Sequence, residues 1–368
     1  MLKLAQIKTM LLAITAISSF ITTSAALAGF WDSPTNYTPA VSDVYICNSD
    51  AGSVSVLNGV TGATLKTILL PSGAKPNGIA FRPDYGSAYV TDSNNGKIYY
   101  LKNEKLQKTI NTSAVGTAQL AINPNGKFAY IRALISSSPW KTAMLVLDTN
   151  PTSLTFNTII RTIDSMWFDG IAFTPDGTRA YITIDGSYGN VSQIKVINTS
   201  SHTITSTIQL PIPTSPLGLA ITPDGKRVYV AGWMANNVSV IDSDPVSSTY
   251  NTVITTIPVS GEARDIALSP SGNLAYVALD TGGVDVIVTA PSSSQFNQVI
   301  KHVPAGPFGG VHSVATSLDG GFTYVTGGES TQITPDVIDS EPFSATFNSV
   351  IKTLPVVYGP AGIAVKPH

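Results

Sequence analysis

The 368-residue sequence has little of what several functional classes require. Its single cysteine, Cys47, excludes an intrachain disulfide, a cysteine-based zinc cluster and a covalently attached haem. Charged residues make up only 12%, and 21 Lys+Arg stand against 23 Asp+Glu, so the excess of positive charge that nucleic-acid binding needs is missing. The sequence also has no glycine-rich phosphate loop, no zinc-ligand spacing and no sustained helical periodicity with caps. We therefore expect no nucleic-acid partner, no metal and no cofactor.

The N-terminal region has the pattern of a secretory signal peptide over residues 1–28. Lys3 and Lys8 form a positively charged region before the apolar stretch from Met10 to Ile21, and Ala26-Leu27-Ala28 forms a small-x-small cleavage site. A membrane anchor is the weaker interpretation because the unbroken apolar run is too short to span a bilayer, and no second run of spanning length follows. We expect a protein exported to the periplasm, the cell surface or the medium, with a lead-in segment over residues 29–43.

One sequence unit recurs seven times along the remaining chain. It resembles Gly-Ile-Ala-Phe-x-Pro-Asp-Gly followed by Ala-Tyr-Val, and its tyrosines are Tyr45, Tyr89, Tyr130, Tyr181, Tyr229, Tyr276 and Tyr324. Each copy holds four short apolar runs, which in the first complete copy are Gly78–Arg82, Ala88–Thr91, Lys97–Leu101 and Leu106–Ile110. Four strands in a unit of about 46 residues are typical of a β-propeller blade. The sequence therefore predicts an all-β, seven-bladed propeller over residues 44–368, with four antiparallel strands in each blade.

The two ends of this region complement each other. The chain enters the repeat at the tyrosine strand, Val44–Cys47, without an inner strand before it, and it ends with an inner strand, Gly362–Pro367. We predict that this C-terminal strand joins three N-terminal strands in one blade, which closes the ring without a free edge. Cys47 would then be a buried thiol on a strand paired with the C-terminal strand.

The repeat resembles the YVTN repeat family of β-propellers. Tyr89-Val90-Thr91, with Gly78-Ile79-Ala80-Phe81 and Pro83-Asp84, carries this resemblance, as does the run from Gly170 to Gly177. It covers nearly all of the chain after residue 28 and implies a seven-bladed propeller of an exported bacterial or archaeal type. Relatives of that fold include surface-layer proteins, lactonases, an antibiotic-ring lyase and redox-enzyme subunits, so the fold does not select the chemistry.

A second motif is nested between the third and fourth strands of four copies. Its members are Asp148 to Asn157, Asp242 to Asn251, Pro291 to Asn297 and Asp339 to Asn348. Asp and Asn in this pattern are compatible with a cation or partner site, or with a stereotyped hairpin whose side chains bond to the local backbone. We interpret the motif as a hairpin.

Departures from the repeat point to one end of the propeller, where loops enter the inner strands and leave the tyrosine strands. Polar residues predicted to ring the mouth of the central channel are Asn77, Gln119, Asp169, Arg264, Asp265 and His312. Aromatic residues predicted for loops on the same face are Trp140, Trp167, Phe168 and Trp233, and an outer polar rim would comprise Asp92, Arg132, Asp185, Asp280 and Glu329. Aromatic walls with a few convergent polar groups are usual in small-molecule sites.

Three functions fit this face. The main hypothesis is a monomeric, non-enzymatic module that binds a small molecule, a glycan or a protein through the mouth residues and aromatics, with the cell surface as one of its locations. The alternative is a lactonase-like hydrolase or a lyase, with His312 as acid or base, Asp169 or Asp265 as its partner, and Arg264 stabilising an oxyanion. A third is a surface-layer or adhesion module that self-assembles. A divalent cation among Asn77, Gln119, Asp169 and Asp265 is disfavoured, because they offer two carboxylates with Arg264 alongside.

Overall fold

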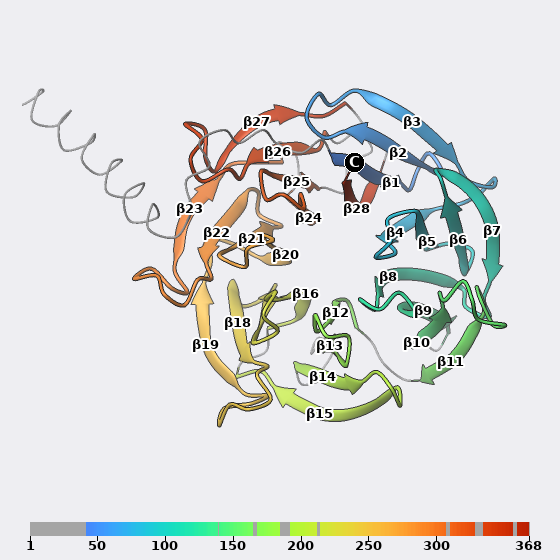
Figure 1. Ribbon diagram of the computed structural model, residues 1–368, viewed down its shortest axis with the longest axis horizontal. Coiled ribbons are helices and arrows are strands. Elements are labelled where there is room, and N and C mark those ends of the chain that lie inside the picture. The colour runs from blue at the N-terminus through green and yellow to red at the C-terminus, as the bar shows by residue number, and fades with distance from the viewer. Residues whose placement is uncertain are drawn as a thin grey trace, which may run out of the picture.

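Seven four-stranded antiparallel sheets stand around a central axis like the blades of a propeller (Figure 1), which confirms the predicted fold class. The computed structural model describes residues 42–138, 140–164, 168–184, 192–211, 214–306, 310–327, 334–355 and 359–367. The predicted signal peptide lies outside the described residues, as does the lead-in up to residue 41. The first strand begins at Ser42, two positions before the predicted start of the propeller. Within the described residues, no helix has the length and apolar character needed to cross a membrane.

Each blade contributes one strand to the wall of the central channel and a second, tyrosine-bearing strand behind it. The inner strands are β28 (Pro360–Pro367), β4 (Pro76–Phe81), β8 (Gly116–Ile122), β12 (Ile171–Phe173), β16 (Pro216–Ile221), β20 (Ala263–Leu268) and β24 (Ser313–Thr316). The tyrosine strands are β1 (Ser42–Asn48), β5 (Ser87–Asp92), β9 (Phe128–Ser137), β13 (Arg179–Ile184), β17 (Arg227–Gly232), β21 (Leu274–Leu279) and β25 (Phe322–Thr326). The tyrosine strands are almost entirely buried, because each blade packs against a neighbour on both faces.

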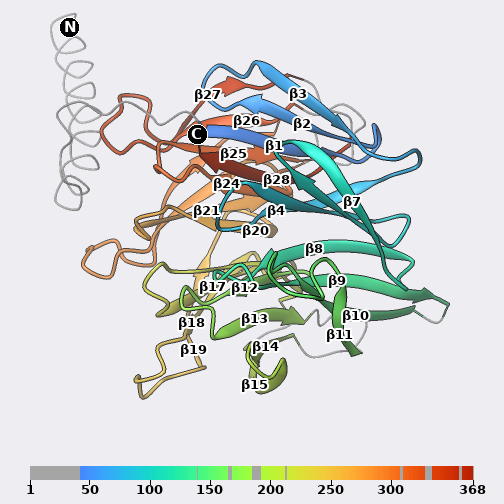
Figure 2. The same ribbon diagram turned by 45° about the vertical axis from the view of Figure 1, so that its right-hand side comes forward.

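The two remaining strands of each blade lead outward to solvent. The third strands are β2 (Ser53–Asn58), β6 (Lys97–Lys102), β10 (Trp140–Asp148), β14 (Gln193–Asn198), β18 (Asn237–Asp242), β22 (Val284–Val288) and β26 (Asp336–Asp339). The outer strands are β3 (Thr64–Leu69), β7 (Lys105–Asn111), β11 (Ile159–Asp164), β15 (Thr203–Gln209), β19 (Val253–Pro258), β23 (Val299–Val303) and β27 (Ser349–Thr353). In the oblique view of Figure 2, the β18–β19 and β22–β23 hairpins project from one end of the ring. Exposed Lys and Thr on the outer strands protect these sheet edges from further pairing.

The ring closes as the ends of the chain predicted. β28 pairs antiparallel with β1, from Ser42 opposite Pro367 to Asn48 opposite Pro360, and the strand order of this blade is β28-β1-β2-β3. Cys47 on β1 is fully buried, and burial raises the pKa of its thiol. The predicted core thiol is confirmed.

Glycine in the inner strands permits close approach between blades. A Cβ built on Gly170 would overlap the carbonyl oxygen of Leu217 in the next blade, and one on Gly362 would overlap the carbonyl oxygen of Asn77. Only a residue without a side chain fits such a backbone contact. The inner strands therefore form a tight, continuous wall, and side chains stand out from it where glycine is replaced.

Hydrogen bonds from the repeat tyrosines join each blade to the next one. In four blades the tyrosine hydroxyl donates to an asparagine Oδ1 at the end of the nested hairpin of the following blade: Tyr89 to Asn157 (2.6 Å), Tyr181 to Asn251 (2.8 Å), Tyr229 to Asn297 (2.9 Å) and Tyr276 to Asn348 (3.2 Å). The hairpin interpretation of this motif is supported, because Asp148 accepts hydrogen bonds from Asn150 N and Thr155 Oγ1 inside the turn. The asparagine adds an inter-blade role that the sequence analysis missed.

Other residues take the place of this asparagine in the remaining blades. Tyr45 donates to Glu104 (3.1 Å), and the Tyr130 hydroxyl lies 2.7 Å from His202 Nδ1. Like the asparagines, Glu104 and His202 have positive φ. The hydroxyl of Tyr324 is buried against Gly59 and has no hydrogen-bond partner among the described residues.

Candidate functional site

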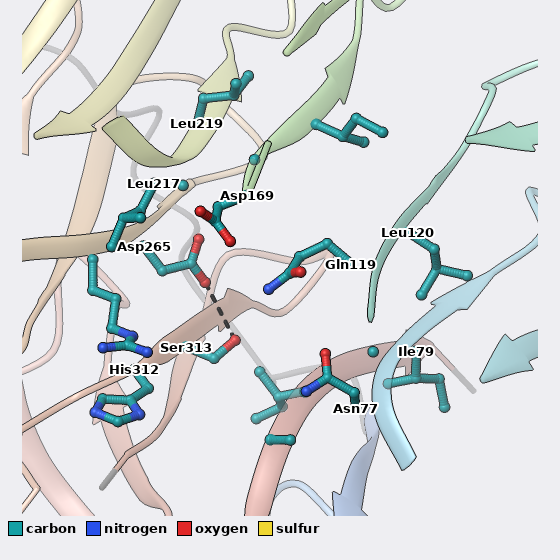
Figure 3. Close-up of a pocket in the computed structure, with 18 residues that line it drawn as sticks. Asn77, Ile79, Gln119, Leu120, Asp169, Leu217, Leu219, Asp265, His312 and Ser313 are labelled. Atoms are coloured by element: carbon teal, nitrogen blue, oxygen red, sulfur yellow. Dashed lines mark hydrogen bonds between the residues drawn. The ribbon is translucent and has the colours of Figure 1, made fainter. Parts of the chain in front are cut away.

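A cavity of about 400 Å³ lies at one mouth of the central channel, where the inner strands begin. All seven blades contribute to its wall: Asn77, Gly78, Ile79, Gln119, Leu120, Asp169, Gly170, Ile171, Leu217, Gly218, Leu219, Arg264, Asp265, His312, Ser313, Ala361, Gly362 and Ile363. Figure 3 shows the Gln119 amide and the carboxylates of Asp169 and Asp265 turned toward the middle of this space. Gln119, Asp265 and Ser313 occupy the position that is glycine in the other four blades, so polar side chains replace backbone contact there.

The six polar residues predicted for the mouth all line this cavity. Their shared position follows from the repeat, because residues in one register of the inner strands face the same end of the channel.

Of the four aromatic residues predicted for this face, the structure describes the side chains of Phe168 and Trp233. Phe168 is fully buried in a core cluster with Tyr130, Met144 and Ile182, so its predicted role on a binding face is wrong. Its ring turns from the loop into the space between two blades, where burial of apolar area stabilises it. Trp233 is half-buried and is absent from the cavity wall. The side chain of Trp140 lies outside the described part of the molecule, as does all of Trp167.

Asp280, at the end of the tyrosine strand β21, connects three predicted residues of this face. Its Oδ2 accepts hydrogen bonds from Arg264 Nη1 at 2.9 Å and from Trp233 Nε1 at 3.0 Å. Its Oδ1 lies 2.8 Å from His312 Nε2. Both His312 and Asp280 are largely shielded, with side chains 19% and 14% exposed, which strengthens electrostatic interactions between them.

The partner of His312 is therefore Asp280, whereas the sequence analysis had paired it with Asp169 or Asp265. Asp280 was recognised only as part of an outer rim. It belongs to the blade before His312, and the tyrosine strand of one blade ends beside the inner-strand entry loop of the next. That adjacency, available from the predicted ring order, was the signal that could have identified the pair.

Asp169 has its own cationic partner. Arg132, on β9 of the preceding blade, places Nη1 2.5 Å from Asp169 Oδ1, and both side chains are 21% exposed. This ion pair links two blades at the cavity wall and neutralises the guanidinium locally.

Asp265, on β20, accepts three hydrogen bonds from groups of the protein. Its Oδ2 accepts hydrogen bonds from Ser313 Oγ and Val314 N, both at 3.2 Å, and its Oδ1 accepts one from Ile266 N at 2.9 Å. Burial nonetheless raises the pKa of this carboxyl, against the effect of these three donors and of nearby Arg264. The Asp265 carboxyl therefore takes up a proton at a higher pH than an exposed aspartate does.

Metal binding at this site finds no support in the described residues. They contain no group of three or more His, Cys, Asp or Glu side chains placed to hold an ion. The two carboxylates that line the cavity, Asp169 and Asp265, are each bound to donors of the protein instead.

Comparison with known proteins identifies the fold. No family model matches the chain, and no curated protein does, so membership of the YVTN repeat family is not confirmed. Among solved structures, a functionally unknown protein from Desulfotomaculum acetoxidans is 17% identical and has a TM-score of 0.71, with 89% of this chain and 99% of that chain covered. The periplasmic gluconolactonase of Pseudomonas aeruginosa is 14% identical, with a TM-score of 0.70 and coverage of 89% and 99%. A candidate 6-phosphogluconolactonase of Bacteroides fragilis is 15% identical, with a TM-score of 0.69 and coverage of 91% and 99%.

These neighbours correct the main functional hypothesis. Two of these solved structures, which share the fold over nearly their whole length, are named for lactone hydrolysis, and this favours the lactonase-like alternative over a non-enzymatic binding module. At these identities the likeness itself concerns the fold. The chain is a seven-bladed β-propeller whose structural neighbours include 6-phosphogluconolactonase-like proteins.

Proposed function

We propose that the protein is a hydrolytic lactonase whose reaction takes place in the cavity at the channel mouth. The observation that carries this proposal is the contact of one carboxylate, Asp280, with both His312 and Arg264 at the cavity wall. Through this carboxylate, a residue that can act as a general base and a cationic residue lie next to each other at the cavity wall. The names of the structural neighbours support the same chemistry.

His312 acts as the general base in this proposal. Asp280 Oδ1 lies 2.8 Å from Nε2 without an aligned hydrogen bond in this structure, and its negative charge favours the tautomer that carries the proton on Nε2. In that tautomer Nδ1 carries the lone pair and takes a proton from the attacking water. Asp280 also stabilises the imidazolium that forms.

Hydrolysis then proceeds in two steps with no other reactant. The water oxygen bonds to the lactone carbonyl carbon, and the negative charge that develops on the carbonyl oxygen is stabilised by Arg264. When this intermediate collapses, the ring C–O bond breaks and the leaving alkoxide takes the proton from His312. The product is the open-chain hydroxy acid.

Trp233 is a positioning residue in this scheme. Its Nε1–H donates to Asp280 Oδ2 at 3.0 Å, on the oxygen that also accepts from Arg264. The indole therefore fixes the rotamer of the carboxylate and through it the orientation of His312. Trp233→Phe should lower kcat with little change in KM, because the indole is outside the cavity wall.

Glucono-δ-lactone hydrolysis, measured as proton release above the spontaneous rate, tests the proposal. His312→Ala should lower kcat/KM by about 10²–10⁴-fold, the usual contribution of a general base. Asp280→Asn should also lower it, because the amide cannot stabilise the imidazolium. His302→Ala, on outer strand β23, is the matched control and should leave the rate unchanged. No hydrolysis by the wild type, or full activity of His312→Ala, would refute the proposal.

We also propose that the protein acts outside the cytoplasm. The signal-peptide pattern of residues 1–28 supports export, and a periplasmic neighbour is compatible with it. N-terminal sequencing of protein recovered from the periplasm or medium should begin at Gly29. A mature chain that starts at Met1 would contradict export by this route.

A further inference from the structure

We infer that the cavity selects neutral, hydroxyl-rich lactones and rejects phosphorylated ones, with Asp169 and Asp265 as the residues that determine this specificity. The inference rests on the proposed lactonase function and names its substrate class. The structural neighbours do not decide between the two substrates, since their names include both gluconolactonase and 6-phosphogluconolactonase.

The charges at the cavity leave no positive surplus for a phosphate. Three carboxylates, of Asp169, Asp265 and Asp280, stand on or directly behind the wall, against the two guanidinium groups of Arg132 and Arg264. Protonation of one carboxyl would only balance the set. A phosphate monoester carries close to two negative charges at neutral pH, so it would enter a site that already contains more anions than cations or an equal number.

Both guanidinium groups are, moreover, already bound to carboxylates. Arg132 contacts Asp169, and Arg264 contacts Asp280. Recognition of a phosphate by arginine relies on paired N–H groups aimed at the anion, and here each arginine directs Nη1 to an internal acid. The N–H groups that Arg264 retains serve the single oxygen of the oxyanion in the proposed reaction and do not form a site for a whole phosphate. A phosphate would have to compete with these shielded partners.

The loops whose structure is not described cannot supply the missing charge. Residues 165–167, 185–191, 212–213, 307–309, 328–333 and 356–358 contain no Lys, Arg or His in the sequence, and their charged residues are the two acids Asp185 and Glu329. The described residues contain no helix, so a helix N-terminus is also absent there as an anion site.

The same wall suits sugar hydroxyls. Carboxylates accept hydrogen bonds, and the amides of Asn77 and Gln119 both donate and accept. A hydroxyl is itself a donor and an acceptor, so several can be satisfied at once by such a ring. Hydrolysis also converts the neutral lactone into a carboxylate, for which this site has no surplus of positive charge. The charge pattern that admits the substrate therefore also favours release of the product.

Competing substrates test this inference. We expect kcat/KM for 6-phosphoglucono-δ-lactone to be about 10- to 100-fold lower than for glucono-δ-lactone, from repulsion between charges several ångströms apart in a partly shielded site. Asp169→Asn removes one negative charge and releases Arg132, so it should narrow this ratio about tenfold. Asp84→Asn removes an equal charge from an exposed turn at the other end of the ring and should leave the ratio unchanged.

Two results would overturn the inference: a phosphorylated lactone that is hydrolysed as well as the neutral one, or a ratio that Asp169→Asn does not move. If neither lactone is hydrolysed, the proposed function fails instead. Calorimetric binding of gluconolactam and its 6-phosphate, which cannot be hydrolysed, then tests charge selection separately. Tighter binding of the neutral lactam would support the inference, and equal or tighter binding of the phosphate would refute it.

Discussion

Removal of one hydroxyl tests whether the tyrosine hydrogen bonds hold neighbouring blades together. Tyr89 is fully buried, and its hydroxyl donates to Asn157 Oδ1 at 2.6 Å, while Asn157 is only 4% exposed. Tyr89→Phe keeps the ring and its packing but leaves a buried acceptor without this donor. We expect a loss of about 1–3 kcal/mol in the free energy of unfolding.

Urea denaturation measures this loss directly, and thermal denaturation should give a decrease in Tm of about 1.5–4.5 °C for a domain of this size. A double-mutant cycle with Asn157→Gly isolates the pairwise interaction, because glycine tolerates the positive φ of position 157. The coupling energy from this cycle should be at least about 0.5 kcal/mol.

Tyr324→Phe is the matched control within the same molecule. Tyr324 is also fully buried and occupies the same place in the repeat, but its hydroxyl has no hydrogen-bond partner among the described residues. The substitution should leave stability unchanged or raise it slightly. If it destabilises the protein as much as Tyr89→Phe does, the effect belongs to packing around the hydroxyl, and the hydrogen-bond argument is refuted.

Three further predictions follow from the fold. Deletion of residues 360–368 removes β28, leaves β1 with an open edge, and should abolish cooperative unfolding; an unchanged Tm would contradict closure of the ring by this strand. Burial, followed by nearby Arg161, lowers the pKa of His202, so the unfolded chain takes up the proton first, and stability should fall as the pH decreases below about 6.5. His202→Asn introduces the residue found at this place in four other blades and should retain the contact with Tyr130. Denaturation at pH 7.5 and at pH 5.0 should show that this variant loses less stability at the lower pH than the wild type does. An identical pH dependence of stability in both proteins would contradict the role of His202. Cys47 should react with a thiol reagent only at the rate of unfolding, and rapid labelling of the native protein would contradict its burial.

The fold could be predicted from the sequence because its signal is repeated. Seven tyrosine strands in one register, and a C-terminal inner strand without a tyrosine strand of its own, determine both the number of blades and the way in which the ring closes. The polar residues of the mouth followed from the same register, since Asn77, Gln119 and Asp265 hold equivalent or adjacent positions on inner strands.

The remaining features depend on side-chain directions that no repeat determines. Phe168 adjoins a mouth residue in sequence, but its ring turns into the core. Asn157 and Tyr89 are 68 residues apart, and nothing in a hairpin motif indicates which neighbour its last residue contacts. The pairing of His312 with Asp280 likewise joins two loops of different blades. The sequence analysis considered only Asp169 and Asp265 as partners, because it compared positions within the repeat and not the order of neighbouring blades in the ring.

Closure of the ring by β28 also determines when the cavity comes into existence. Ala361, Gly362 and Ile363 belong to both the closing strand and the cavity wall, so the same residues complete the fold and the site. Pairing of β28 with β1 joins segments more than 300 residues apart, which makes it a late, entropically costly event in folding. A chain interrupted before this strand would have six whole blades and an incomplete pocket. Catalytic competence would thus arise only in molecules whose last strand is in place, and activity would report on the integrity of the chain as well as on its chemistry.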